Sequence, residues 1–404
     1  MDSRNKKKGM YDLLLKGGDI IDPSQGFHQV GSVAIREGKI AKVGEDIPEA
    51  EARKVVDVQG KIISPGLIDM HAHAAAGFTW LGVPADEAGL NTGVTLLGDG
   101  GSAGSANFEA LRRLVVQPAK TDMLCFLNLA RTGLITLAEI RDARDIDTEE
   151  SKGVAELNRD IIKGIKVRAV QSLADGVGIK GIEMAKKLAT DLRLPLMVHI
   201  GEPRERIAGD KMDDFSRSAV SLMEKGDILS HFLTWETGGL ILKDGTVYPE
   251  LEAARKRGVV LDSCHGLNHF SFTIARQALS RGLIPTVIST DMAVPTLPAV
   301  QSLAVTMSKF LNLGLSLDQV IEMTTINPAK ALGEEQRRGS LRPGMNADLT
   351  VMELLSGDYL FADGNGRERM SGRVLLEPRM VFKSGKGMPA YSNYHIPPLF
   401  EPGH

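Results

Sequence analysis

Two histidines separated by one residue, His71 and His73, end an apolar run that leaves the turn at Pro65 and Gly66. Residues i and i+2 of a strand point to the same side, so both imidazoles can face one point where the strand ends. Imidazole is the commonest metal ligand among protein side chains. The pair alone is a weak signal, but it predicts further ligands at the ends of later strands.

Later apolar runs also end in residues that can bind metals or move protons. Four of these runs are residues 196–198, 227–230, 259–262 and 286–289. The residues at their ends are, in the same order, His199, His231, Cys264 with His265, and Asp291. Any one of these histidines by itself is read more simply as a hydrogen-bonded core side chain. Together with the first pair, however, His199, His231 and Asp291 favour a metal site.

Four histidines and one aspartate exceed the ligands of a single tetrahedral zinc with an open position, but they suit two ions joined by a further anion. Lys166 lies in the strongly apolar fourth run, where an unpaired ammonium would be costly. Carboxylation of its amine by CO2 would give an anionic carbamate that can bridge two cations. The alternative is that Lys166 pairs with an acid or points between helices, and the residues leave both readings open.

The elements that must position these residues are eight apolar runs, spread over roughly 230 residues and alternating with helical stretches. They are residues 66–70, 93–97, 123–129, 164–168, 196–198, 227–230, 259–262 and 286–289. This order predicts an α/β fold, a (β/α)8 TIM barrel, whose active site lies at the carboxyl ends of the strands. A doubly wound sheet is the alternative, but the glycines at 98–101 follow the second run and lack the spacing of its phosphate loop.

Short strands and tight turns flank the predicted barrel on both sides. Hairpin signals at Glu37-Gly38 and Gln59-Gly60 precede it, and β-like sequence returns at Gly339. Residues 374–376 and 379–382 are expected to form a closing pair of strands. We therefore predict a small β-sandwich built from residues 1–63 and 339–404, with the barrel at residues 64–338.

The composition is that of an ordinary globular protein, and a small-molecule substrate is the expected partner. The 404 residues carry a formal net charge of −3, which gives no electrostatic reason to expect nucleic acid or a membrane surface as partner. The two cysteines, Cys125 and Cys264, cannot build a disulfide framework, and the polar amino terminus lacks a signal peptide's apolar segment. A cytoplasmic protein is expected, and a homo-oligomer stays open.

Several motifs resemble those of the amidohydrolase superfamily over about residues 12–382. They are Pro65-Gly66-Leu67-Ile68-Asp69-x-His71-x-His73, His199, His231, Asp291, Asn327-Pro328-Ala329 and Gly344-x-x-Ala347-Asp348. The stretch 165–168 and Cys264-His265-Gly266 are similar to the amidohydrolase/deacetylase or dihydroorotase-like branch. The resemblance implies a (β/α)8 barrel with a flanking β-sandwich and a two-metal site.

The resemblance also implies the role of each ligand. His71, His73 and Asp291 would hold one metal, His199 and His231 the other, and Lys166 would be the carbamate bridge. Zinc is the preferred ion, although nitrogen and oxygen ligands also suit manganese, iron or cobalt. The expected function is metal-assisted hydrolysis of an amide or ester, with Asp291 as general base and then acid.

The substrate is expected to be small and to carry a carboxylate. Arg168 shares a strand face with Lys166 and offers a fork for that carboxylate, while His265 would bind the carbonyl or the oxyanion. Arg168 could instead neutralise an acid such as Asp99 or Asp175. Cys264 is read as packing, and His269 and Glu202 lie near the site in the sequence.

Three alternatives remain at this stage. Dihydroorotases and hydantoinases, which open cyclic amides, often carry an arginine two residues after the second histidine, where this chain has Ala75. A deaminase would use one metal and a His-x-x-Glu motif, which His199 and Glu202 match in spacing, although Lys166 argues against it. A non-catalytic barrel would have lost metal ligands, and this chain keeps them all.

Overall fold

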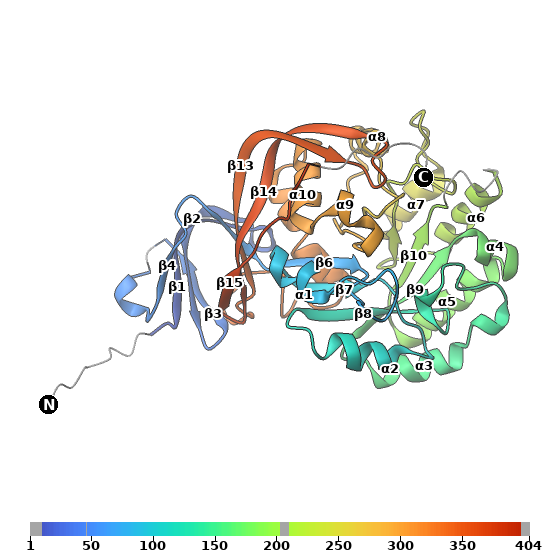
Figure 1. The fold of residues 1–404 in the computed structure, drawn as a ribbon, viewed down its shortest axis with the longest axis horizontal. Coiled ribbons are helices and arrows are strands. Elements are labelled where there is room, and N and C mark those ends of the chain that lie inside the picture. The colour runs from blue at the N-terminus through green and yellow to red at the C-terminus, as the bar shows by residue number, and fades with distance from the viewer. Residues whose placement is uncertain (1–9, 46, 203–209, 397–404) are drawn as a thin grey trace.

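The parallel sheet that forms the barrel follows the chain in order. The computed structural model describes residues 10–45, 47–202 and 210–396. Seven parallel strands lie side by side in sequence order and curl around a common interior (Figure 1). They are β6 (Leu67–Ala72), β7 (Val94–Asp99), β8 (Asp122–Asn128), β9 (Ile162–Ala169), β10 (Leu196–Ile200), β11 (Ile228–Ser230) and β12 (Val260–Asp262).

The eighth predicted run closes the barrel without forming a regular strand. Val287 makes a parallel bridge to Asp262 of β12, and Met292 makes one to Ala72 of β6. The segment therefore joins the last strand to the first. It stays irregular because Asp291 has a φ of 51°, which interrupts the extended backbone between the two bridges. The predicted TIM-barrel fold is confirmed, with one strand replaced by this bridging segment.

Alternation along the strands separates the inside of the barrel from its outside. The interior is filled by Ile68, Met70, Leu96, Leu124, Phe126, Met197, Ile228 and Val287, together with Ala329 and Leu332 from the region of α12 (Ile326–Ala331). Neighbouring residues such as Val198 belong instead to the core between strands and helices. The helix thus closes the amino-terminal end of the barrel, opposite the histidines.

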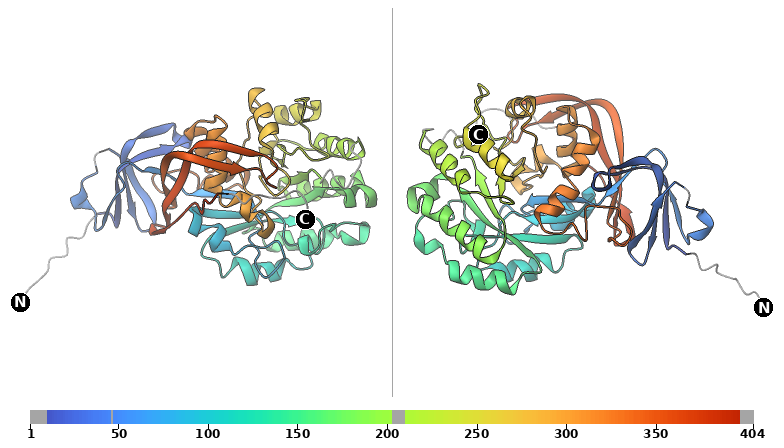
Figure 2. Two further views of the ribbon diagram at one scale, coloured as in Figure 1. Left: turned by 45° about the horizontal axis from the view of Figure 1, so that its top comes forward. Right: turned by 180° about the vertical axis from the view of Figure 1, so that it is seen from behind.

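Helices cover the outer face of the parallel sheet (Figure 2). On α5 (Ile179–Leu192), Ile182, Ala185 and Ala189 recur at helical spacing and are all buried. The remaining helices are α1 (Ala85–Ala88), α2 (Phe108–Leu111), α3 (Thr148–Leu157), α4 (Gln171–Gly176), α6 (Asp210–Ser221), α7 (Pro249–Arg257), α8 (Phe272–Ser280), α9 (Leu297–Val300), α10 (Leu303–Asn312) and α11 (Leu317–Glu322). Within the described ranges, no helix combines the length and the apolar character needed to cross a membrane.

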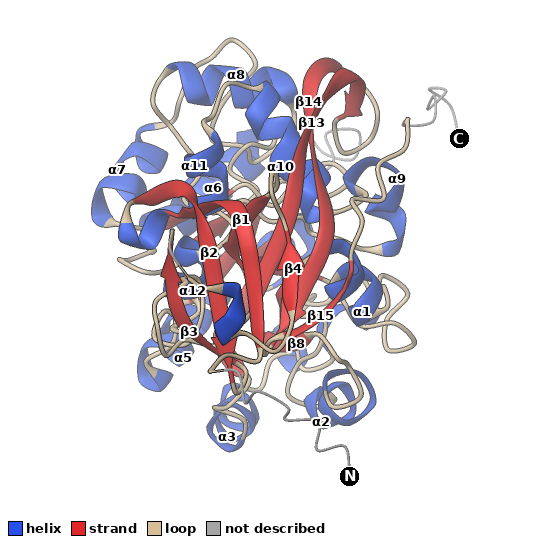
Figure 3. Ribbon diagram, turned by 90° about the vertical axis from the view of Figure 1, so that its left-hand side faces the viewer, coloured by secondary structure: helices blue, strands red, loops and turns tan. Residues whose placement is uncertain are grey.

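A second, mixed sheet unites the two ends of the chain, as the sequence predicts (Figure 3). Its strands are β1 (Leu13–Asp22), β2 (Phe27–Arg36), β3 (Lys39–Gly44), β4 (Val55–Asp57), β5 (Ile62–Pro65), β13 (Leu349–Ala362), β14 (Arg369–Lys383) and β15 (Lys386–Pro389). β5 lies between β1 and β13, so all eight strands form one hydrogen-bonded sheet. The division of the chain at residues 63 and 338 stays a prediction.

The expected closing pair of strands at 374–376 and 379–382 is wrong, because both segments belong to the single strand β14. Pro378 does not break this strand, since it lies opposite Met352 at a register shift where one ladder hydrogen bond is already lost. β14 instead pairs along its length with β13. This long hairpin rises beside α10, where Ser308 Oγ accepts a hydrogen bond from the Leu376 amide at 2.9 Å (Figure 1).

Candidate metal centre

A cavity of about 460 Å³ opens at the carboxyl ends of the barrel strands. Its walls include the side chains of His73, Lys166, Arg168, His199, His269 and Asp291. They come from β6, β9, β10, the segment after β12 and the bridging segment, because parallel strands present their carboxyl ends at the same edge.

His71, His73 and Asp291 form the first group of candidate ligands. His73 Nε2 lies 3.1 Å and His71 Nε2 lies 3.8 Å from Asp291 Oδ1. The other ring nitrogens have partners of their own: His73 Nδ1 lies 3.1 Å from Ser102 Oγ, and His71 Nδ1 lies 3.3 Å from Asp262 Oδ2. Partners on the far side hold each ring so that its Nε2 faces the shared point.

His199 and His231 form the second group, with ring centroids 4.3 Å apart. His231 Nδ1 lies 2.7 Å from the Cys264 carbonyl oxygen, which leaves Nε2 to face Asp291 Oδ2 at 4.0 Å. His199 Nε2 is buried, and none of the described residues gives it a hydrogen-bond partner. A buried ring nitrogen without a hydrogen-bond partner is available to bind a metal ion.

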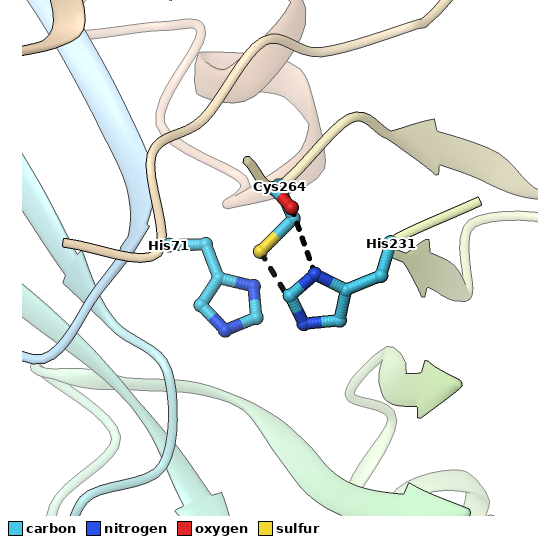
Figure 4. Close-up of side chains that lie close together, drawn as sticks. All are labelled: His71, His231 and Cys264. Carbon is cyan, nitrogen blue, oxygen red and sulfur yellow. Dashed lines mark hydrogen bonds between the residues drawn. The ribbon is translucent and has the colours of Figure 1, made fainter. Parts of the chain in front are cut away.

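Cys264 lies close to the rings of His71 and His231 (Figure 4). Its Sγ is 3.7 Å from His231 Nε2. Burial raises the pKa of the Cys264 thiol well above its usual range, so the group stays neutral. This environment agrees with a packing role.

Lys166 lies beside the first group and is fully enclosed. Its Nζ lies 3.1 Å from His71 Nε2 and 3.5 Å from Met197 Sδ. Among the described residues, no carboxylate lies within ion-pair distance of this amine. Lys166 is therefore not paired with any acid in the described ranges. Burial lowers the pKa of Lys166 to about 8, which increases the fraction of neutral amine near pH 7.

The charge of Asp291 is stabilised by the surrounding imidazoles. Burial alone would raise its pKa, but the hydrogen bond and charge of His73, with His231 and His71, hold the pKa of Asp291 well below its usual range. The carboxylate is therefore ionised and lies between the two histidine groups. Two pairs of imidazoles with an ionised carboxylate between them are a set of ligands that suits divalent metal ions.

Arg168 reaches the cavity but already has an acidic partner. Its Nη1 donates to Glu139 Oε2 at 3.0 Å, and both side chains are largely buried. Neither acid considered from the sequence is the partner, since Asp99 accepts from Ser102 and Asp175 pairs with Lys211. Glu139 lies in a long irregular loop, where the sequence carries no signal of its contact.

His265 does not line the cavity and has no free ring nitrogen. Its Nδ1 donates to the Gly266 carbonyl oxygen at 3.0 Å, its Nε2 accepts from Lys309 Nζ at 2.8 Å, and the ring stacks on Phe270. This geometry gives no support to the predicted contact with substrate. The buried Lys309 of α10, which also donates to the Ala299 carbonyl, was missed by sequence reasoning.

Glu202 and His269 both line the cavity. Glu202 Oε2 accepts a hydrogen bond from the Gln171 amide at 3.1 Å, which orients it from the neighbouring loop. His269 joins His199 and His231 in a third group of candidate ligands. Sequence reasoning placed both residues near the site but gave neither a role.

Comparison with known proteins identifies relatives across most of the chain. The family model described as the amidohydrolase family matches residues 62–388. A deacetylase from Agrobacterium fabrum is 34% identical over 85% of this chain and 83% of its own length. A deacetylase from Enterococcus faecalis is 30% identical over 89% of this chain and 95% of its own.

Solved structures agree with this similarity. A dihydroorotase structure has a TM-score of 0.81 and 32% identity, and covers 94% of this chain and 99% of its own. An adenine deaminase structure has a TM-score of 0.84 and 28% identity, and covers 94% of this chain and 100% of its own. The chain and these structures share the fold over 94% of this chain.

Proposed function

Because this chain belongs to the amidohydrolase family, which is generally metal-dependent, and is similar to deacetylases over most of its length, we propose that it is a binuclear-metal deacetylase of a small carboxylate-bearing compound. The observation that carries the proposal is the position of Asp291. Its two carboxylate oxygens face His73 and His71 on one side and His231 on the other.

The ligands divide between two ions. His71, His73 and Asp291 would hold one ion, His199 and His231 would hold the other, and a carbamate on Lys166 would join the two sets of ligands. Support for the carbamate comes from the enclosed amine, which lies 3.1 Å from a candidate ligand and has no acidic partner among the described residues. Zinc is the preferred ion because imidazole and carboxylate are its usual ligands alongside thiolate.

The protein's own groups then move protons and hold the substrate. When bound, the ions supply a water of lowered pKa and a polarised carbonyl. Asp291 would serve as general base, taking up the proton of the attacking water, and then as general acid toward the leaving amine or alkoxide. The surrounding imidazoles keep Asp291 ionised at the start of this cycle.

The cavity and Arg168 favour a small acetylated acid as substrate. A volume of about 460 Å³ lies within the usual range for small-molecule sites, roughly 300–1,000 Å³. Glu139 engages Nη1 of Arg168, and the guanidinium has five N–H groups in all, so donors remain for a substrate carboxylate. The likeness to deacetylases points to acetyl as the acyl group.

The test combines metal analysis with a matched pair of substrates. We expect two divalent ions per chain, and faster hydrolysis of an N- or O-acetyl α-carboxylate than of its methyl ester. Arg168→Met should abolish that preference while the metal content stays unchanged. Equal turnover of acid and ester would remove Arg168 from substrate binding, and fewer than two ions would contradict the binuclear centre.

Asp291→Asn separates chemistry from metal binding in the same assay. An amide cannot take up the proton, so kcat should fall roughly 10²- to 10⁴-fold. Metal content is measured in parallel, because the same change also removes a charged ligand. Activity near that of the wild type would exclude Asp291 as the proton acceptor.

A ring-opening reaction on a cyclic amide is the second candidate. The likeness to the solved dihydroorotase, over nearly its whole length, favours it. Ala75 stands against it, because it occupies the position where such enzymes often have an arginine for the substrate carboxylate. Adding a dihydropyrimidine acid and an aminopurine to the screen distinguishes this reaction and deamination from deacetylation.

A further inference from the structure

His269 has a position that the proposed mechanism does not use. It follows β12 in the segment that leads to α8, and its ring faces two candidate ligands. The ring centroid lies 4.7 Å from that of His199 and 4.3 Å from that of His231. One ring nitrogen from each of these three histidines lies within 4.8 Å of the others.

Two nitrogens of this group lack hydrogen-bond partners. His269 Nδ1 and His199 Nε2 are both buried atoms for which the described residues provide no donor or acceptor. The remaining histidine, His231, has its Nδ1 occupied by the Cys264 carbonyl, so only its Nε2 is available. Buried polar atoms are rarely left without a partner, and here two of the three histidines in one group each have such an atom.

The surrounding backbone leaves room for this third imidazole. A Cβ at position 201 would lie 3.0 Å from His269 Nδ1, and one at position 266 would lie 3.4 Å from His269 Cδ2. Both positions are glycine, with φ values of 101° and 60°. The turns after β10 and β12 can therefore approach the ring closely, and a larger residue at either turn would crowd it.

We propose that His269 is a third histidine ligand of the ion held by His199 and His231. The proposal rests on the proposed two-metal function and deepens it. Three imidazoles are a known ligand set for zinc with one position left open. The second ion would then have three histidine ligands of its own in addition to the carbamate of Lys166.

The test is Co²⁺ titration of the metal-free protein, monitored by the visible absorption of the bound ion. His269→Ala should lower the affinity for one of the two ions. The decrease should be at least the roughly 10- to 100-fold that loss of an outer-shell partner causes. The absorption band should change because an imidazole has been lost. His269→Gln keeps much of the side chain's size and should behave in the same way.

His395→Ala is the matched control, since His395 is exposed and, among the described residues, its ring hydrogen-bonds only to the Asn393 carbonyl. It should leave both affinities and the spectrum unchanged. Circular dichroism and thermal unfolding confirm that each variant is folded, and the glutamine variant replaces the alanine variant if the latter is not.

The outcomes separate this proposal from the function on which it rests. Affinities within twofold of the wild type and an unchanged band in both His269 variants would overturn the ligand role. A raised KM with the same unchanged spectrum would overturn it too and would assign His269 to the substrate. If the wild type binds only one ion, the binuclear function fails, while the effect of His269→Ala on that ion still decides the ligand role. If it binds none, both fail.

Discussion

At the scale of single residues, the metal centre depends on side chains behind the ligands. Asp262 is fully buried and lies 3.3 Å from His71 Nδ1, while Ser230 Oγ and Ser289 Oγ donate to the same carboxylate. A carboxylate held in this way fixes the tautomer and the orientation of the imidazole in front of it. The ring is thus aligned before any ion arrives.

Asp262→Asn should therefore weaken metal binding although Asp262 is not proposed as a ligand. The amide can present its nitrogen to His71 Nδ1 and favour the wrong tautomer, so affinity for one ion should fall roughly 10- to 100-fold. Competition with a chelator measures this affinity. An unchanged affinity would show that the position of His71 is set by its strand alone.

Lys309 should make stability depend on pH. Burial lowers the pKa of Lys309 from 10.5 to about 7, with Asp363 opposing the shift. Between these values the unfolded chain binds more protons than the folded one. The free energy of unfolding should therefore rise with pH between about 7 and 10.5, and the full destabilising effect is present below about pH 7.

Urea unfolding of the wild type and Lys309→Met at pH 7 and 8.5 measures this contribution. As the pH rises, the free energy of unfolding of the wild type should increase relative to that of the variant by up to about 1.4 kcal/mol per pH unit. Asp363 titrates below this interval, since burial raises its pKa to about 6. Parallel pH profiles would show that the amine is charged in the folded protein.

The candidate ligands could be predicted from the sequence because each is marked by its position in a strand: at i and i+2 on one face, or at the carboxyl end of a barrel strand. His71 and His73 are two residues apart, and His199 and His231 directly follow apolar runs. The partners of Arg168 and His265 could not be predicted in this way. Glu139 lies in an irregular loop, and Lys309 is 44 residues from the histidine that it contacts.

At the scale of elements, the passage from the mixed sheet to the barrel is a single residue, Gly66, between β5 and β6. A Cβ there would lie 2.4 Å from Thr95 Oγ1 of β7. The first barrel strand can pack against its neighbour only without that carbon. Gly66 therefore sets the starting point of the strand that ends at His71 and His73.

Gly66→Ala should lower the free energy of unfolding by about 1–3 kcal/mol, the usual cost of overpacking. Gly153→Ala is the control, because a Cβ at this position on α3 meets nothing within 4 Å. It should stabilise the protein by roughly 0.5–1 kcal/mol through helix propensity. Chemical denaturation compares the two, and equal effects would show that Thr95 moves aside freely.

The elements most poorly predicted from the sequence are those with irregular backbone or mixed polarity. The eighth barrel run reads as a strand, but the positive φ of Asp291 cannot be seen in an apolar pattern. β13 and β14 extend far beyond their apolar residues, because exposed positions such as Gly357 and Asp358 lie in the middle of the hairpin. The two strands continue through these exposed positions because they pair with each other and because β14 contacts α10.

At the scale of the whole molecule, the mixed sheet connects both ends of the chain to the barrel. β5 pairs with β1 on one side and with β13 on the other, and Thr350 Oγ1 of β13 accepts from the amide of Leu67 in β6 at 3.2 Å. Residues near both ends of the sequence therefore support the strand that carries the first two ligands.

A chain that stops at residue 338 should consequently fail to form a stable barrel. It would leave the edge of β5 unpaired and would remove Leu349, Val351 and Phe382 from the core of the mixed sheet. Size-exclusion chromatography and circular dichroism should show aggregation or loss of cooperative unfolding. A monomeric product that binds two metal ions would show that the barrel is independent of the second sheet.

The order of strands in the mixed sheet also bears on how the protein is made. Ser64 of β5 contacts Thr350 of β13 across 286 residues of sequence. At roughly 5–20 residues per second, the ribosome delivers β13 about 15–60 s after β5. During that interval the nascent chain carries an open strand edge beside an unfinished barrel. Until β13 arrives, that edge is open to pairing with another chain, which makes the delay a period of exposure to aggregation.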